Sequence, residues 1–150
     1  MKNQVWIFLL LGCVLAVSGC ATDSLTGSAV GSAEPLAVED QATLISALEG
    51  SGATVEIGEP VSQVFFSAEG TVLKVNGVDV QVFEYQSPEE MENEASQVSP
   101  DGGSIGTSMV TWVDVPHFYK TNRIIVLYVG NDASVLDVLE SALGPQFAGR

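Results

Sequence analysis

The spacing of apolar residues changes along the chain, and each spacing predicts a helix or a strand. After Glu39 the spacing is helical, with one apolar face behind acidic residues suited to a first turn. That face consists of Leu44, Ile45 and Leu48. Gly50 is expected to end this helix, because glycine is favoured at helix C-termini. Ala53–Ile57 then alternates between apolar and polar residues, which predicts a short strand ending at Gly58–Pro60.

The dipeptide Asn76-Gly77 lies between two runs rich in β-branched residues, Thr71–Val75 and Val78–Tyr85. This arrangement predicts a hairpin with a two-residue type I′ turn, because asparagine and glycine both tolerate positive φ. The expected register pairs Val75 with Val78, Lys74 with Asp79, and Leu73 with Val80. A further short strand is predicted at Val64–Phe66.

A second helix is predicted to begin at Ser87–Glu90, which combines a capping box with proline at the first helical position. It should extend to about Val98 and bury Met91, Ala95 and Val98. Ser99–Gly103 is rich in helix-breaking residues and should end it.

Two more strands are predicted in the last third of the chain. They are Met109–Val115 and Arg123–Val129, with Pro116–Asn122 as the connection between them. The second strand is apolar without interruption from Ile124 to Leu127, which predicts a central position covered on both faces.

A last helix is predicted between the N-cap residue Asp132 and the helix-breaking pair Gly144-Pro145. Its apolar side holds Val135, Leu136, Leu139 and Leu143. The predicted order is therefore α-β-β-β-β-α-β-β-α. This order indicates an α+β fold, with a small antiparallel or mixed sheet of about five to six strands and three helices.

The first twenty residues have a pattern typical of a targeting segment. Lys2 precedes an uncharged run of thirteen residues, Val5–Val17. As a helix this run would extend about 20 Å, short of the roughly 30 Å hydrocarbon core of a membrane. It is therefore interpreted as the apolar part of a signal peptide.

Val17-Ser18-Gly19-Cys20 follows the apolar run and resembles the lipobox of bacterial lipoproteins. This resemblance covers residues 1–20 only. It implies that residues 1–19 form a cleaved signal peptide and that Cys20 carries lipid, including acyl chains such as palmitate. Two or three acyl chains anchor a protein durably, since each buried CH₂ contributes about 0.8 kcal/mol. The resemblance thus implies anchoring on the extracytoplasmic side of the cell membrane or the outer membrane.

Beyond the signal, residues 20–37 are small and polar and are expected to form a flexible tether. Residues 38–150 are expected to form a single acidic domain. Cys13 would be removed with the signal and Cys20 would be alkylated, so this domain has no thiol for a disulfide.

The charge of the chain restricts its partners. Loss of residues 1–19 would leave 4 basic and 19 acidic residues, a formal charge of −15. Nucleic acids and anionic lipid headgroups both require a basic surface, so the charge argues against them as partners. The charge favours cationic or neutral partners instead.

Catalytic chemistry has few candidates in this sequence. His117 is the only histidine, and Asp114 lies three residues before it, which leaves open a hydrolase that uses this pair. No Gly-x-Ser-x-Gly nucleophile motif accompanies them, so no catalytic residue is assigned.

Metal and cofactor sites are not predicted. The acidic residues of 89–94 would be spread around a helix, and a calcium loop is missing. The glycine-rich segment 101–108 lacks the Gly-Lys-Ser/Thr ending of a phosphate-binding loop.

Aromatic residues supply the remaining candidate site. Most should lie in the core, because a domain of this size without disulfides needs large apolar side chains inside. A binding surface is predicted at Trp112, His117, Phe118 and Tyr119, on the condition that these residues are exposed together.

The function expected from these observations is that of a membrane-anchored extracytoplasmic lipoprotein, acting as a noncatalytic binding or accessory module of the cell envelope. Its partner would be an envelope protein or a small ligand. The folded part resembles small exported bacterial proteins of unknown activity and suggests no named family. Two alternatives remain open, namely an envelope hydrolase using His117 and Asp114, and an acidic structural spacer.

Overall fold

The structure is a computed structural model that describes residues 37–150. Its main element is a six-stranded sheet in the order β1-β2-β3-β7-β6-β8, and every neighbouring pair is antiparallel. The strands are β1 (Val55–Val61), β2 (Gly70–Val75), β3 (Val78–Glu84), β6 (Pro116–Thr121), β7 (Ile124–Val129) and β8 (Ala148–Gly149). A separate hairpin is formed by β4 (Ser104–Ile105) and β5 (Ser108–Met109).

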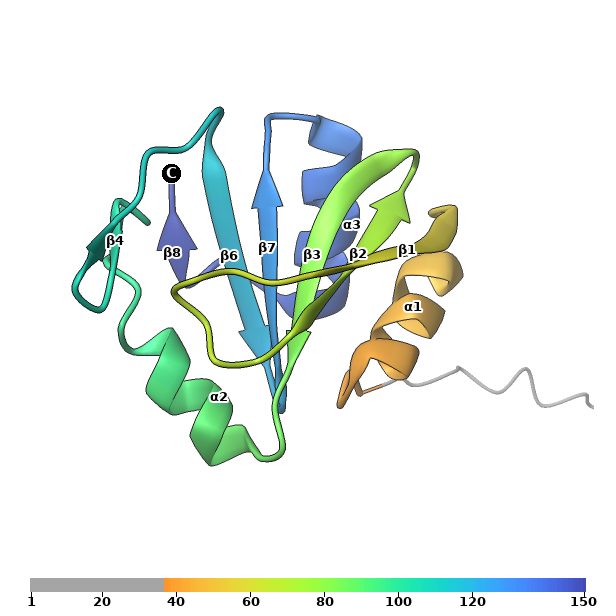
Figure 1. Cartoon of the computed structure of the whole chain (residues 1–150). Coiled ribbons are helices and arrows are strands. Elements are labelled where there is room, and N and C mark those ends of the chain that lie inside the picture. Colours follow the sequence, from red (N-terminus) through yellow and green to blue (C-terminus); the bar gives the residue numbers. More distant parts are fainter. Residues whose placement is uncertain (1–36) are drawn as a thin grey trace, which may run out of the picture. The chain divides into compact units, whose positions relative to one another are not determined.

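Three helices cover the two faces of the sheet (Figure 1). They are α1 (Gln41–Gly50), α2 (Pro88–Ala95) and α3 (Ala133–Leu143). α1 and α3 pack side by side on one face, whereas α2 and the β4–β5 hairpin lie on the other. The predicted α+β fold class is confirmed, and the sheet is antiparallel rather than mixed.

Strand β7 shows why both faces need a cover. Ile124, Val126 and Tyr128 belong to the core under α1 and α3, while Ile125 and Leu127 belong to the core under α2. All five side chains are at most 2% exposed. The predicted central strand is confirmed, because β7 lies between β3 and β6.

The hairpin at Asn76-Gly77 also has the predicted geometry. Asn76 and Gly77 have φ angles of 52° and 83°, as a type I′ turn requires. The pairs Val75–Val78, Lys74–Asp79 and Leu73–Val80 form in the predicted register. Lys74 Nζ lies 2.6 Å from Asp79 Oδ1 on the solvent side.

Strand β1 is longer than the sequence pattern predicted. Gly58–Pro60 was expected to end it, but the strand continues to Val61 with a shift of register between Ile57 and Pro60. Proline is tolerated here because β1 is an edge strand and Pro60 lies at the register shift.

Two further predictions on the α2 side of the sheet were wrong. Val64–Phe66 is a turn instead of a strand, and the segment crosses the face of the sheet (Figure 1). The second helix ends at Ala95, and Val98 instead forms a bridge to Ile105 of β4. Phe66 and Val98 are nevertheless buried, so their apolar character reflects packing onto the sheet.

The predicted strand Met109–Val115 was also wrong. Only Met109 belongs to a strand, and residues 110–115 form a loop. The expected connection, Pro116–Asn122, is instead strand β6 followed by a tight turn. Asn122 adopts a φ of 47°, and Thr121 pairs directly with Ile124. The proline and histidine at the start of β6 suggested a loop, but this segment is a buried strand with aromatic residues.

Among the described residues, one buried side-chain polar atom has no hydrogen-bond partner, the hydroxyl oxygen of Tyr85 beneath α2. Burial, together with the negative charge of Glu94, raises the pKa of Tyr85 above its ordinary value of 10.0. The contribution of this shift to stability is therefore fully present below pH 10 and is lost as the pH rises further. The reason is that the Tyr85 hydroxyl ionises more easily in the unfolded chain than in the folded one.

We expect Tyr85→Phe to raise the free energy of unfolding at pH 7 by about 1 kcal/mol, because it removes an unsatisfied buried group. It should also weaken the loss of stability above pH 10. Urea titrations at pH 7 and pH 10.5 measure both effects. Some alkaline dependence should remain, since burial and Glu140 raise the pKa of Tyr119 as well. Lower stability of the variant at pH 7 would contradict the prediction.

Asp132 caps α3, with Oδ1 accepting hydrogen bonds from the backbone N–H and the hydroxyl of Ser134. These bonds lower the pKa of Asp132 below its ordinary value of 3.8. Stability from the charged cap is thus present above about pH 4 and lost as the pH falls below it. Asp132→Asn keeps an acceptor, so we expect a shallower decline in the thermal midpoint between pH 5 and pH 2.5. An unchanged pH profile would exclude this role.

Candidate functional site

The four residues of the predicted binding surface are not exposed together. Phe118 and Tyr119 are neighbours in β6 and point to opposite faces of the sheet, where they are 0% and 3% exposed. His117 is 6% exposed on the same side as Tyr119. Trp112 lies in the loop 110–115 and is half-buried. The condition for a shared surface of these four residues is therefore not met.

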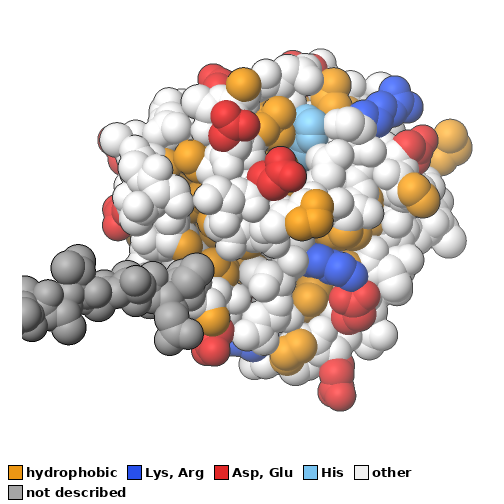
Figure 2. Space-filling model, turned by 180° about the vertical axis from the view of Figure 1, so that it is seen from behind, with side chains coloured by type: hydrophobic (Ala, Val, Ile, Leu, Met, Phe, Trp, Pro, Cys, Tyr) orange, Lys and Arg blue, Asp and Glu red, His pale blue; other side chains and the backbone are white. Residues whose placement is uncertain are grey.

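His117 is held by both of its ring nitrogens. Nδ1 lies 2.7 Å from Gln146 Oε1, and Nε2 lies 3.0 Å from the carbonyl oxygen of Gly130. The ring also stacks on Tyr128 at 5.8 Å between centroids. Seen from behind, only a small part of the pale-blue ring reaches the surface (Figure 2). His117 thus links the start and the end of the α3 region to the sheet.

The geometry does not join His117 to Asp114. Asp114 Oδ1 accepts hydrogen bonds from Asn131 Nδ2 at 2.6 Å and from the Val115 N–H at 2.8 Å. Nε2 of His117 faces the Gly130 carbonyl oxygen and Nδ1 faces the Gln146 amide, so both nitrogens are already engaged and neither is placed against a hydroxyl nucleophile. No observation on these side chains favours a hydrolase.

The described residues also form a hollow with polar groups in its lining, which we call the Trp112 cleft. It has a volume of about 450 Å³ and lies between the loop after α2, the loop 110–115 and the residue that follows β8. Its lining includes Asp101, Val110, Trp112, Asp114 and Arg150.

Trp112 is fixed in this cleft from three directions. Its Nε1 donates a hydrogen bond of 2.7 Å to the carbonyl oxygen of Gly102. Its ring meets Phe65 and Phe118 edge to face, with centroids 5.9 and 5.7 Å apart. Gly102 has a φ of +69°, and a Cβ there would come within 2.9 Å of Phe118. Tight contact with the core therefore holds the wall of the cleft rigid.

Two carboxylates flank Trp112, and each is anchored through one oxygen. Asp101 Oδ1 accepts hydrogen bonds from the Gly103 N–H and the Ser99 hydroxyl, which lower the pKa of Asp101. Asp114 Oδ1 is held by Asn131, as described above. Anchoring through Oδ1 orients each carboxylate and leaves its Oδ2 for other contacts.

Three exposed apolar side chains lie within three residues, in sequence, of the contacting rings of Trp112 and Phe65. Val113 is 99% exposed, Met109 is 92% exposed and Val64 is 97% exposed. Val113 directly follows Trp112, and Val64 directly precedes Phe65. The rings of Trp112 and Phe65 are in contact. We call the cleft with these three side chains the Trp112 surface. Sequence reasoning singled out Trp112 as an aromatic residue, but no sequence signal marked Val64, Met109 and Val113 as exposed.

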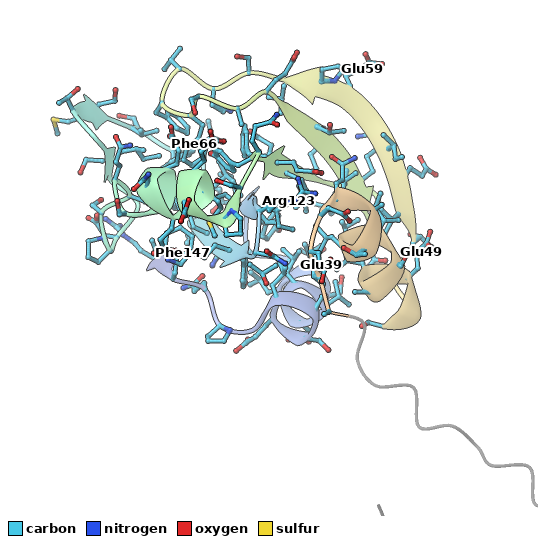
Figure 3. The ribbon with its side chains drawn as sticks, turned by 90° about the horizontal axis from the view of Figure 1, so that it is seen from below. Glu39, Glu49, Glu59, Phe66, Arg123 and Phe147 are labelled. Carbon is cyan, nitrogen blue, oxygen red and sulfur yellow. The ribbon has the colours of Figure 1, made fainter. Side chains whose placement is uncertain are left out.

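Near α1, one end of the sheet holds a cluster of charged side chains that are paired with one another. Arg123 Nη2 lies 3.0 Å from Glu84 Oε1 and 3.8 Å from Asp40 Oδ2, between the sheet and the start of α1 (Figure 3). Arg123 Nη1 also donates to the carbonyl oxygen of Tyr85. These contacts tie α1 to the sheet.

Comparison with known proteins gave no relative. No family model, no curated protein and no solved structure matches this chain. Among residues 37–150, no three acidic, cysteine or histidine side chains converge as metal ligands would. In the same range, no helix has the length and apolar character needed to cross a membrane. Cys20 and the predicted tether lie largely outside the described residues.

Proposed function

We propose that this chain is an exported lipoprotein, held at an envelope membrane by lipid on Cys20, and that its domain is a noncatalytic module that binds another protein. The observation that carries the binding role is the Trp112 surface. It combines a rigid aromatic wall with three apolar side chains that are almost fully exposed.

Such a combination costs a soluble domain hydration free energy unless a partner covers it. Tryptophan held in a well-packed setting is also a preferred anchor in protein interfaces, because little side-chain entropy is lost on binding. By contrast, the exposed Ile57 stands alone on the edge strand beside Glu56. A single exposed residue needs no explanation of this kind.

The membrane address is supported by Val17–Cys20, which resembles a lipobox, and by the short apolar run before it. The intact mass of the protein purified from bacterial membranes tests this address. We expect a mass that lacks residues 1–19 and includes diacylglycerol on Cys20. Cys20→Ala should lose the lipid and leave the membrane fraction. An unmodified mass for the wild-type chain would overturn the address.

Binding is tested by cross-linking in intact envelopes, using the full chain. We expect wild type and the control Ile57→Asp to give the same cross-linked partner, and Val113→Asp to lose it. Both substitutions replace an exposed apolar side chain by an aspartate, so the change in net charge is the same. Circular dichroism should show that both variants are folded. Equal recovery of the cross-linked partner with Val113→Asp and Ile57→Asp would show that the Trp112 surface is not the binding site.

A further inference from the structure

The chemistry of the Trp112 cleft indicates more about its occupant. Asp101 and Asp114 line the cleft with Trp112, and hydrogen bonds orient each carboxylate, from Gly103 for Asp101 and from Asn131 for Asp114. Carboxylates beside an indole ring are suited to a guanidinium or ammonium group, which can pair with the oxygens and pack against the ring.

The cleft already borders a guanidinium of its own chain. Arg150 Nη2 lies 3.9 Å from Asp101 Oδ2, and the two side chains are 71% and 59% exposed. The closest contacts of the other pairs are shorter, for example 2.6 Å for Lys74 with Asp79 and 3.0 Å for Arg123 with Glu84. A long and exposed ion pair contributes little stability, so another cation can replace Arg150 at small cost.

The charge of the whole domain acts in the same direction. Seventeen of the 19 acidic residues lie within residues 37–150, against four basic residues. Each of these four basic side chains has a carboxylate within 4.0 Å. In the described part of the chain, the charged side chains that have no ion-pair partner are therefore all carboxylates. This field attracts a basic partner and repels a second copy of the chain.

We propose that the Trp112 surface binds a basic, apolar segment of a protein partner, and that an arginine or lysine of this segment enters the cleft between Asp101 and Asp114 and replaces Arg150. This inference rests on the proposed binding function and names the chemistry of its partner. Val64, Met109 and Val113 would cover the apolar residues on either side of the inserted cation.

The test uses the full chain, purified in detergent and immobilised, with a phage-displayed library of random heptapeptides as the probe. Peptides selected on wild type but not on Trp112→Ala are then synthesised. We expect them to carry arginine or lysine next to apolar residues. Replacing that arginine by citrulline keeps the shape but removes the charge, and acetylation of the lysine removes the charge while keeping its alkyl chain. Either change should weaken binding about tenfold or more.

Variants of the protein supply the second half of the test. Asp114→Asn and Asp101→Asn should each weaken binding of the arginine peptide by about tenfold, whereas the matched control Asp137→Asn on α3 should not. Arg150→Gln should strengthen it severalfold. Weaker binding by Arg150→Gln, or equal effects of all three Asp→Asn changes, would overturn the inference.

The outcomes separate the two proposals. Selected peptides that depend on Trp112 but contain no basic residue would overturn the proposal that a cation enters the cleft. The proposed binding surface would stand. Failure to select any peptide that distinguishes wild type from Trp112→Ala would count against both the surface and its occupant.

Discussion

Replacing Phe118 by alanine is expected to lower the free energy of unfolding by about 3 to 5 kcal/mol, the usual cost of deleting a buried phenylalanine. Phe118 is 0% exposed and contacts the rings of Trp112 and Phe147. The cavity left behind cannot close easily, because Gly102 and β6 are fixed by backbone hydrogen bonds on either side. Urea denaturation followed by circular dichroism measures the change.

The matched control is Val113→Ala, in the loop next to Trp112. Val113 is 99% exposed, so its truncation should change the free energy of unfolding by no more than about 0.5 kcal/mol. The same variant should nevertheless weaken partner binding, if the Trp112 surface is the interface. Similar losses of stability for both variants would contradict the division between core and surface in this region.

His117→Phe is expected to destabilise the domain by about 2 kcal/mol. Phenylalanine keeps a flat ring against Tyr128, but it leaves the buried carbonyl oxygen of Gly130 without a donor. Gln146 is exposed and can turn to water, so its share of the loss should be small. The midpoint of urea unfolding measures this change directly.

Gln146→Ala serves as the control for this prediction. It removes only the bond to Nδ1 and should cost about 0.5 to 1 kcal/mol. If His117→Phe were as stable as wild type, the bond to Gly130 would contribute nothing, and a role for His117 outside the fold would have to be sought. A loss of stability would instead explain the histidine without any catalysis.

Elements whose signals are local in the sequence were predicted well. The type I′ hairpin follows from Asn76-Gly77 alone, because few residues adopt positive φ at two adjacent positions. The caps Ser87 and Asp132 begin α2 and α3 as predicted. The long apolar run of β7 identified the central strand, since only a strand covered on both faces buries consecutive residues.

Elements that depend on distant partners were predicted poorly. Strand β6 begins with proline and histidine, and it is a strand because β7 and β8 pair with it from both sides. The loop 110–115 has alternating apolar residues, but β8 takes the place beside β6 that the loop would need as a strand. No sequence pattern marks a two-residue strand near the end of the described chain.

The sequence by itself determined the fold class, the hairpin register, the two cap positions and the strongly acidic charge, because each depends on neighbouring residues or on composition alone. It also contains the lipobox-like segment that predicts the membrane address. Only the tertiary structure decided that Phe118 and Tyr119 are buried on opposite faces and that Val64, Met109 and Val113 are exposed. The physical reason is that exposure depends on which distant segments cover a side chain, and an apolar residue looks the same in sequence whether it is covered or not.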